Sequence, residues 1–145
     1  MNDWQKRFSQ KMELVRDVSR ERFAQFARTD LGSVFEEFRE FTFQQGIQPT
    51  TPIAKPGIQT FKFALTENTF LLLTFRLKGL EHCEMLAEYF VPKHEKIQPI
   101  SEVMELSDVD GDWVRGMFER ALERYVEVCV EAFAGKNAAA QLAGV

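Results

Sequence analysis

The sequence has few of the residues that build catalytic and metal sites. Its 145 residues include two cysteines and two histidines, at no spacing typical of a zinc site. It also lacks a glycine-rich phosphate loop and a Gly-x-Ser-x-Gly nucleophile motif. We therefore expect no cofactor, and these absences favour a non-enzymatic protein.

Basic charge is also scarce. The net charge is −4, and residues 101–131 hold nine acidic and three basic side chains. Proteins that bind nucleic acid or anionic membranes present a basic surface, so we predict neither partner. No apolar run approaches the length of a membrane span, and the polar N-terminal residues lack the apolar region of a signal peptide. With two cysteines and no disulfide framework, we expect a cytoplasmic protein.

Phenylalanine, in contrast, is abundant: the chain has 14 Phe but only two Trp and two Tyr. A Phe ring is large and carries no polar group, so this composition predicts a bulky core or an adhesive interface. The length suits one domain, which we place at residues 1–135. The small residues of 136–145 predict a mobile tail.

The clearest pattern lies at residues 58–77. Apolar residues recur at every second position in two runs, Phe61 to Leu65 and Leu71 to Leu77. A period of two, interrupted by turn-tolerant residues, predicts an antiparallel β-hairpin. One sheet face collects these residues if the loop has an odd length, so we predict an odd loop with Asn68 at positive φ.

A helix is predicted at residues 3–28 from an apolar stripe that runs from Trp4 to Phe26. Lys11 and Arg22 project into the same stripe. Long basic side chains can lay their stems along an apolar surface. The alternative is that this face meets an acidic partner surface.

Two further helices are predicted. Ser33 and Glu36 have the spacing of a capping box, so a second helix is expected at residues 34–45, ended by Gly46. The third and clearest helix spans residues 112–134 and is expected to end at Gly135.

The remaining segments complete the predicted fold. Residues 49–57 contain three prolines and are expected to form a connecting loop. Residues 80–91 alternate as a third strand, although a helix also fits, and residues 92–106 suggest one short element of uncertain type. The prediction is an α+β fold: two N-terminal helices, a three- to four-stranded antiparallel meander and a long C-terminal helix packed on the sheet.

One acidic segment resembles a calcium-binding loop over twelve residues. Asp108, Asp110, Asp112 and Glu119 occupy the first, third, fifth and twelfth positions of an EF-hand loop. The sixth position, which requires glycine for a sharp turn, is Trp113. We favour the alternative that the aspartates cap the helix that follows.

A cysteine–histidine nucleophile is not expected. His82 and Cys83 are neighbours, and neighbours on a strand point to opposite faces. Cys83 is therefore interpreted as a buried cysteine beside an exposed histidine.

Two functional hypotheses remain. The first is a protein-binding or chaperone-like module, forming a homodimer, whose partner contacts the apolar residues off the main core faces: Phe43, Phe70, Leu72 and Phe90. The order of helix, three strands and helix, with an acidic balance, is similar to secretion-chaperone-like domains, which bind extended peptides as dimers. The second is a small-molecule-binding protein or enzyme with a cleft between the sheet and the C-terminal helix, where Cys83, Tyr89, His94 and Tyr125 are the candidates.

Overall fold

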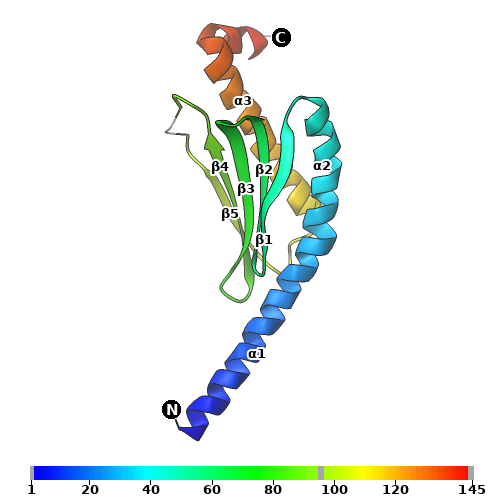
Figure 1. Cartoon of the computed structure of the whole chain (residues 1–145), viewed down its shortest axis with the longest axis vertical. Helices are drawn as coiled ribbons and strands as arrows, with labels where there is room; N and C mark the ends of the chain where they lie inside the picture. The colour runs from blue at the N-terminus through cyan, green and yellow to red at the C-terminus, as the bar shows by residue number, and fades with distance from the viewer. Residues whose placement is uncertain (1, 95–96, 144–145) are drawn as a thin grey trace.

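A computed structural model describes residues 2–94 and 97–143, with side chains through Ala134 (Figure 1). The described chain consists of α1 (Asp3–Phe26), a π-helical turn η1 (Ala27–Leu31), α2 (Gly32–Gln44), β1 (Gln48–Lys55), β2 (Ile58–Thr66), β3 (Thr69–Lys78), β4 (His82–Phe90), β5 (Ile100–Glu105) and α3 (Gly111–Ala143). The strands form one antiparallel sheet in sequence order. The α+β class is confirmed, with five strands instead of three to four.

The additional strand is β1, in the segment expected to be a loop. Pro49 and Pro52 are compatible with it because β1 is the edge of the sheet and pairs only with β2 among the described strands. The pairing shifts register between Thr50 and Ile53, which breaks the ladder near the second proline. The short element expected after residue 92 is β5, the opposite edge.

The hairpin of β2 and β3 has the predicted core face but not the predicted loop. Phe61 pairs with Leu73 and Phe63 with Leu71, and all four side chains are fully buried. Leu65, predicted on the same face, is instead 37% exposed. The strands are joined by a two-residue turn, Glu67-Asn68, and a register shift between Ala64 and Thr66 supplies the extra residue. The odd-length loop was therefore wrong. Asn68 does not have a positive φ; among the described non-glycine residues only Lys93 does.

The two N-terminal helices are continuous, as Figure 1 shows, rather than separated by a break at residues 29–32. Gly32 keeps a right-handed helical conformation, and the π-helical turn accommodates the irregular segment before it. The predicted capping box of Ser33 and Glu36 is absent, since α2 starts without a side-chain cap. At the other end Gly46 has a φ of 82°, which allows α2 to end where the sequence predicted.

The core lies between one face of the sheet and the helices α2 and α3. The ring of Phe118 on α3 is central: its centroid lies 5.4 Å from that of Phe38 on α2 and 5.2 Å from that of Phe61 on β2. It also lies 6.0 Å from Phe63 and 5.9 Å from Phe75 on β3. Most of the phenylalanines between residues 23 and 75 are therefore part of the core, as their abundance predicted.

Helix α3 is attached to the hairpin through Tyr125. Its buried hydroxyl donates a hydrogen bond to the carbonyl oxygen of Thr69 at 2.8 Å and accepts one from the backbone N–H of Leu65 at 3.3 Å. These bonds give hydrogen-bond partners to the N–H of Leu65 and the carbonyl of Thr69, next to the register shift between Ala64 and Thr66. Helix α3 continues to Ala143 instead of ending at Gly135, because the alanine-rich segment after Gly135 favours a helix. The predicted tail therefore begins as helix, and its residues 144–145 lie outside the described chain.

We predict that Tyr125→Phe lowers the free energy of unfolding by about 1–3 kcal/mol, because it leaves buried backbone groups without partners. Tyr89→Phe is the matched control. The hydroxyl of Tyr89 is also buried, but it has no hydrogen-bond partner among the described residues, so its removal should change stability by less than about 0.5 kcal/mol or raise it. Urea denaturation measures both variants; equal losses would contradict the assigned role of Tyr125.

Candidate functional site

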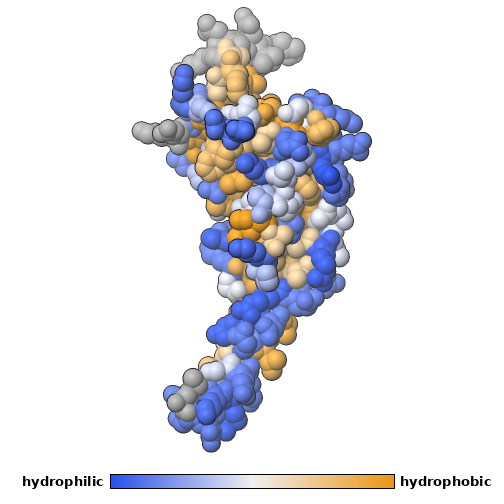
Figure 2. Space-filling model, in the orientation of Figure 1, coloured by the Kyte–Doolittle hydropathy of each residue, from blue (hydrophilic) through white to orange (hydrophobic). Residues whose placement is uncertain are grey.

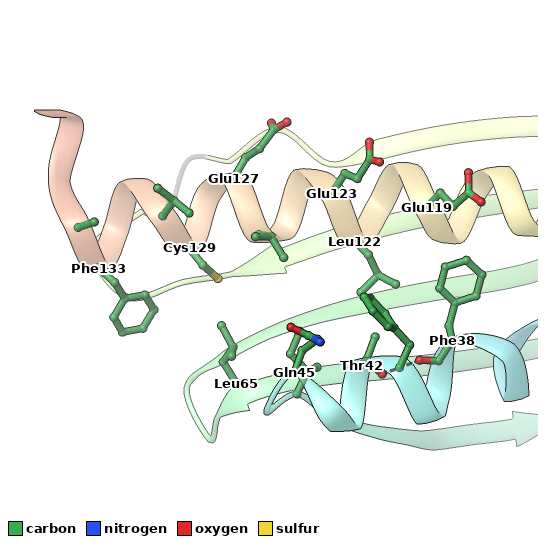
Figure 3. Close-up of a pocket in the computed structure, with 15 residues that line it drawn as sticks. Phe38, Thr42, Gln45, Leu65, Glu119, Leu122, Glu123, Glu127, Cys129 and Phe133 are labelled. Atoms are coloured by element: carbon green, nitrogen blue, oxygen red, sulfur yellow. Dashed lines mark hydrogen bonds between the residues drawn. The ribbon is translucent and has the colours of Figure 1, made fainter. Parts of the chain in front are cut away.

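An apolar groove of about 880 Å³ lies between the second half of α2 and the middle of α3. Figure 3 shows Phe38 and Thr42 on α2 and Gln45 directly after it, with Leu122, Cys129 and Phe133 on α3 and Leu65 of β2 at the same end. The complete lining is Phe38, Phe41, Thr42, Gln45, Ile47, Leu65, Glu119, Leu122, Glu123, Val126, Glu127, Cys129, Val130, Phe133 and Ala134.

The groove forms because α2 and α3 pack closely only near their N-terminal ends. There the guanidinium of Arg115 binds the carboxylate of Glu37 through two hydrogen bonds of 3.0 Å each, and the rings of Phe38 and Phe118 are in contact. Beyond this contact the two helices separate toward the other end of the sheet (Figure 1). The apolar side chains that face the gap therefore have no partner helix.

Several groove residues are unusually exposed for their type. Phe41 on α2 is 61% exposed and Phe133 on α3 is 66% exposed, with Val126 between them also exposed. Large apolar side chains gathered on one concave surface are typical of interaction sites. The hydroxyl of Thr42, in contrast, is satisfied within α2 by the carbonyl oxygen of Phe38 at 2.8 Å, so it offers little to an incoming ligand.

One rim of the groove is acidic. Glu119, Glu123 and Glu127 follow one another at intervals of four residues along α3, an interval that places side chains in a row on a helix. Figure 3 shows them on the edge of α3 away from α2, with their carboxylates pointing away from the gap. Among the described residues, Glu119 and Glu123 form no ion pair, whereas Glu127 lies 3.5 Å from the guanidinium of Arg124. The groove thus combines an apolar floor with a row of negative charge.

The predicted partner-binding residues divide between two places. Phe70, Leu72 and Phe90 lie together on the sheet face away from the helices, where the rings of Phe70 and Phe90 stack at 4.8 Å. Lys62 lies over the Phe70 ring, 4.3 Å from its centroid. Phe43 is 63% exposed on α2 and does not join this cluster.

The remainder of that open sheet face is polar. Arg76 and Lys78 form ion pairs with the largely buried carboxylate of Glu84 at the opposite end. Figure 2, viewed onto the sheet, shows apolar and charged side chains intermixed over this face. Its apolar part is therefore small, and three of its charged groups, Arg76, Lys78 and Glu84, pair with one another.

The four pocket candidates do not converge on one cavity. Cys83, Tyr89 and Tyr125 are buried in the core, while His94 lies in the loop after β4. Cys83 and Tyr89 sit six residues apart on β4, a distance of about 20 Å. None of the four lines the groove.

Burial also alters the acidity of these groups. Desolvation raises the pKa of the Cys83 thiol to about 12 and that of the Tyr89 hydroxyl to about 12. Desolvation likewise raises the pKa of Tyr125. A thiol with a raised pKa is a poor nucleophile near neutral pH, because only the thiolate attacks.

The acidic segment before α3 has a structural role. The carboxylate of Asp110 accepts a hydrogen bond of 2.8 Å from the backbone N–H of Trp113, which caps α3 as the favoured alternative predicted. Asp112 forms an ion pair of 2.9 Å with Arg115, and Glu119 belongs to the groove. The described residues contain no cluster of three or more acidic, histidine or cysteine side chains arranged to hold a metal ion.

A second exposed apolar surface, on α1, has no contact with the core. We define the α1 stripe as Trp4, Phe8, Leu14, Val15 and Val18, all of which are exposed. The rings of Trp4 and Phe8 stack on each other at 5.5 Å. Only the last part of α1 is buried, at Ser19, Phe23 and Phe26. The sequence showed the amphipathic pattern of α1, but it did not show that the apolar side of this helix would remain uncovered.

The groove itself was not predicted. Phe38 and Phe41 were recognisable as apolar residues of one helix, and Leu122, Cys129 and Phe133 as apolar residues of another. The apolar faces of these two helices are wider than a helix needs to cover one sheet face, and this excess was the signal in the sequence for an additional apolar surface. How far the two helices separate depends on their packing angle, which periodicity does not contain.

No family model, curated protein or solved structure matches the chain. In the described part of the chain, the helices are too short or too polar to cross a membrane.

We predict that Cys83 reacts with iodoacetamide at pH 8 far more slowly in the native chain than in the urea-unfolded chain. The physical reason is its burial and its raised pKa, which keep the thiolate population small. Mass spectrometry of peptides distinguishes Cys83 from Cys129. Rapid alkylation of native Cys83 at pH 6 would show an activated thiol and contradict the assignment.

Proposed function

We propose that this chain is a non-enzymatic protein-binding module of chaperone-like character, and that the groove between α2 and α3 is its binding site. The supporting observation is the combination of an apolar floor with the acidic row Glu119, Glu123 and Glu127. The partner that fits this chemistry is an amphipathic helix with an apolar stripe and basic residues beside it. Binding of such a helix in an apolar groove is a common recognition mode.

The lining favours a protein partner over a reaction. A small-molecule site needs a few convergent polar groups that orient the ligand. Here most of the lining is apolar, the hydroxyl of Thr42 is already bonded, and the three glutamates lie along the outer rim, which leaves the amide of Gln45 as the polar group inside the groove. The groove also extends along α3 from Glu119 to Ala134, a length of about 22 Å, which suits four turns of a helix.

A second candidate is a carrier of an apolar small molecule. The volume of the groove, about 880 Å³, favours this candidate because it lies within the usual range of roughly 300–1,000 Å³ for ligand pockets.

The first proposal also includes a cytoplasmic location, which two unpaired cysteines suit, and the formation of a homodimer. It includes as well the absence of nucleic-acid and membrane partners, which the acidic balance supports.

The binding test compares two designed amphipathic peptides of about 18 residues with the same Leu/Phe stripe, one flanked by lysines and one by glutamates. We expect the lysine peptide to bind at least about tenfold more tightly, and its affinity to fall with added salt. Fluorescence anisotropy measures both. Binding of neither peptide, together with saturable binding of a fluorescent fatty acid, would replace the first proposal by the second.

Two phenylalanines on α2 provide a matched pair of variants. Phe41 and Phe43 are 61% and 63% exposed, but only Phe41 lines the large groove. We expect Phe41→Ser to weaken the lysine peptide by at least about tenfold, because it removes an apolar anchor, and Phe43→Ser to leave its affinity unchanged. The reverse result would move the binding site to the other side of α2.

A further inference from the structure

We propose that the helix that occupies the groove is α1 of a second copy of this chain, so that two copies exchange their first helices. This inference rests on the proposed function, because it names the partner of the same groove. Each copy would then supply both a helix and a groove.

The first argument is the exposure of α1. Trp4 is 62% exposed, Phe8 54% and Val18 62%, and these side chains share one side of the helix at 100° per residue. Packing this stripe against another surface would bury several large apolar side chains, and burial of apolar area is favourable. The α1 stripe therefore requires a surface that one copy does not provide.

The second argument is that α1 cannot reach its own groove. Through η1 it continues directly into α2 and projects beyond the sheet, with the N-terminus at the end of the molecule opposite the groove (Figure 1). Reaching its own groove would require the chain to reverse within this helix. Only another copy can place α1 there without unfolding it.

The third argument is length. The α1 stripe spans Trp4 to Val18, about 21 Å at 1.5 Å per residue. The α3 wall of the groove spans Glu119 to Ala134, about 22 Å. The stripe therefore matches the α3 wall in length, whereas the opposite wall, from Phe38 to Gln45, covers about 10 Å of it.

The fourth argument is charge. Arg7 and Lys11 lie within the α1 stripe, four residues apart, and form no ion pair with any described residue. Of the other basic side chains of α1, Arg16 and Arg20 bind Glu13 and Asp17 on the opposite side of the helix. Neither Lys6 nor Arg22 is in an ion pair with a described residue; Arg22 lies on the same side as the stripe, and Lys6 lies on the opposite side. Three of the four unpaired cations of α1 therefore accompany the stripe, and two unpaired carboxylates, Glu119 and Glu123, line the groove.

The spacing of these charges also agrees. Glu119, Glu123 and Glu127 repeat every four residues, the same interval that separates Arg7 from Lys11. A two-fold axis between the copies places α1 antiparallel to the partner's α2 and α3. In this direction the Trp4 end meets the Phe133 end of the groove, and the two cations lie beside the glutamate row. The exchange is reciprocal, so the interface closes at two chains.

The experiment measures the self-association of the full chain by sedimentation velocity at micromolar concentration. We expect a dimer that dissociates in Phe8→Asp and in Phe41→Ser, but not in Phe43→Ser. Each variant should weaken one site by about tenfold. Because a dimer contains two equivalent sites, the dissociation constant should rise by about a hundredfold.

Mixing separates this exchange from other dimers. In an equimolar mixture of Phe8→Asp and Phe41→Ser chains, each mixed dimer retains one intact site. In that site the unaltered α1 of the Phe41→Ser chain occupies the unaltered groove of the Phe8→Asp chain. The other site carries both changes, and because both lie in the same contact we expect their losses there to be less than multiplicative. On that condition the mixed dimer forms more tightly than either variant with itself. If α1 instead paired with α1 in a coiled coil, Phe41→Ser would have no effect, and the inference would be overturned.

Charge reversal provides a further check. Lys11→Glu and Glu123→Lys should each weaken the dimer by about two- to fivefold per site, and a chain with both changes should recover. Failure of the double variant to recover, with a stable fold by circular dichroism, would count against the antiparallel placement of α1.

The two proposals fail in distinguishable ways. A monomeric wild-type chain that still binds the lysine peptide would overturn the exchange of α1 and leave the proposed function intact. A monomer that binds neither peptide would overturn both. If the exchange occurs, Phe8→Asp vacates the groove, so this variant should bind the lysine peptide more tightly than the wild type.

Discussion

The contact of Phe118 with Phe38, Phe61, Phe63 and Phe75 is the interaction on which the rest of the fold depends. It joins α2, α3 and the central strands in one aromatic cluster. Because the two helices meet here, at their N-terminal parts, their C-terminal parts are free to separate. The packing that stabilises the core is thus also the cause of the open groove.

The exposed apolar surfaces of this molecule have unpaired charges beside them. On the open sheet face Glu84 pairs with Arg76 and Lys78, and on the outer side of α1 Glu13 pairs with Arg16 and Arg20. On the α1 stripe and the groove rim, Lys11 and Glu123 remain unpaired among the described residues and lie beside exposed apolar side chains. Surfaces with unpaired charge beside apolar area gain most from a complementary partner.

The hairpin and the segment before it show what could be predicted. Alternation of Phe61, Phe63, Leu71 and Leu73 determined a sheet face, because a period of two leaves no other way to bury all four. The loop was mispredicted, since a bulge near Leu65 has the same effect on the faces as an odd loop. β1 was missed because prolines exclude a central strand but not an edge strand, and the sequence does not state which strand is outermost.

The sequence by itself determined the α+β class, the helical character of both ends, the buried odd-numbered face and the amphipathic nature of α1. These follow from periodicity and composition, which act within a few residues along the chain. Only the tertiary structure decided that α1 continues through a π-helical turn away from the core, and that α2 and α3 separate into a groove. Both depend on the direction in which helices leave a shared contact, and side-chain packing between distant segments sets that direction.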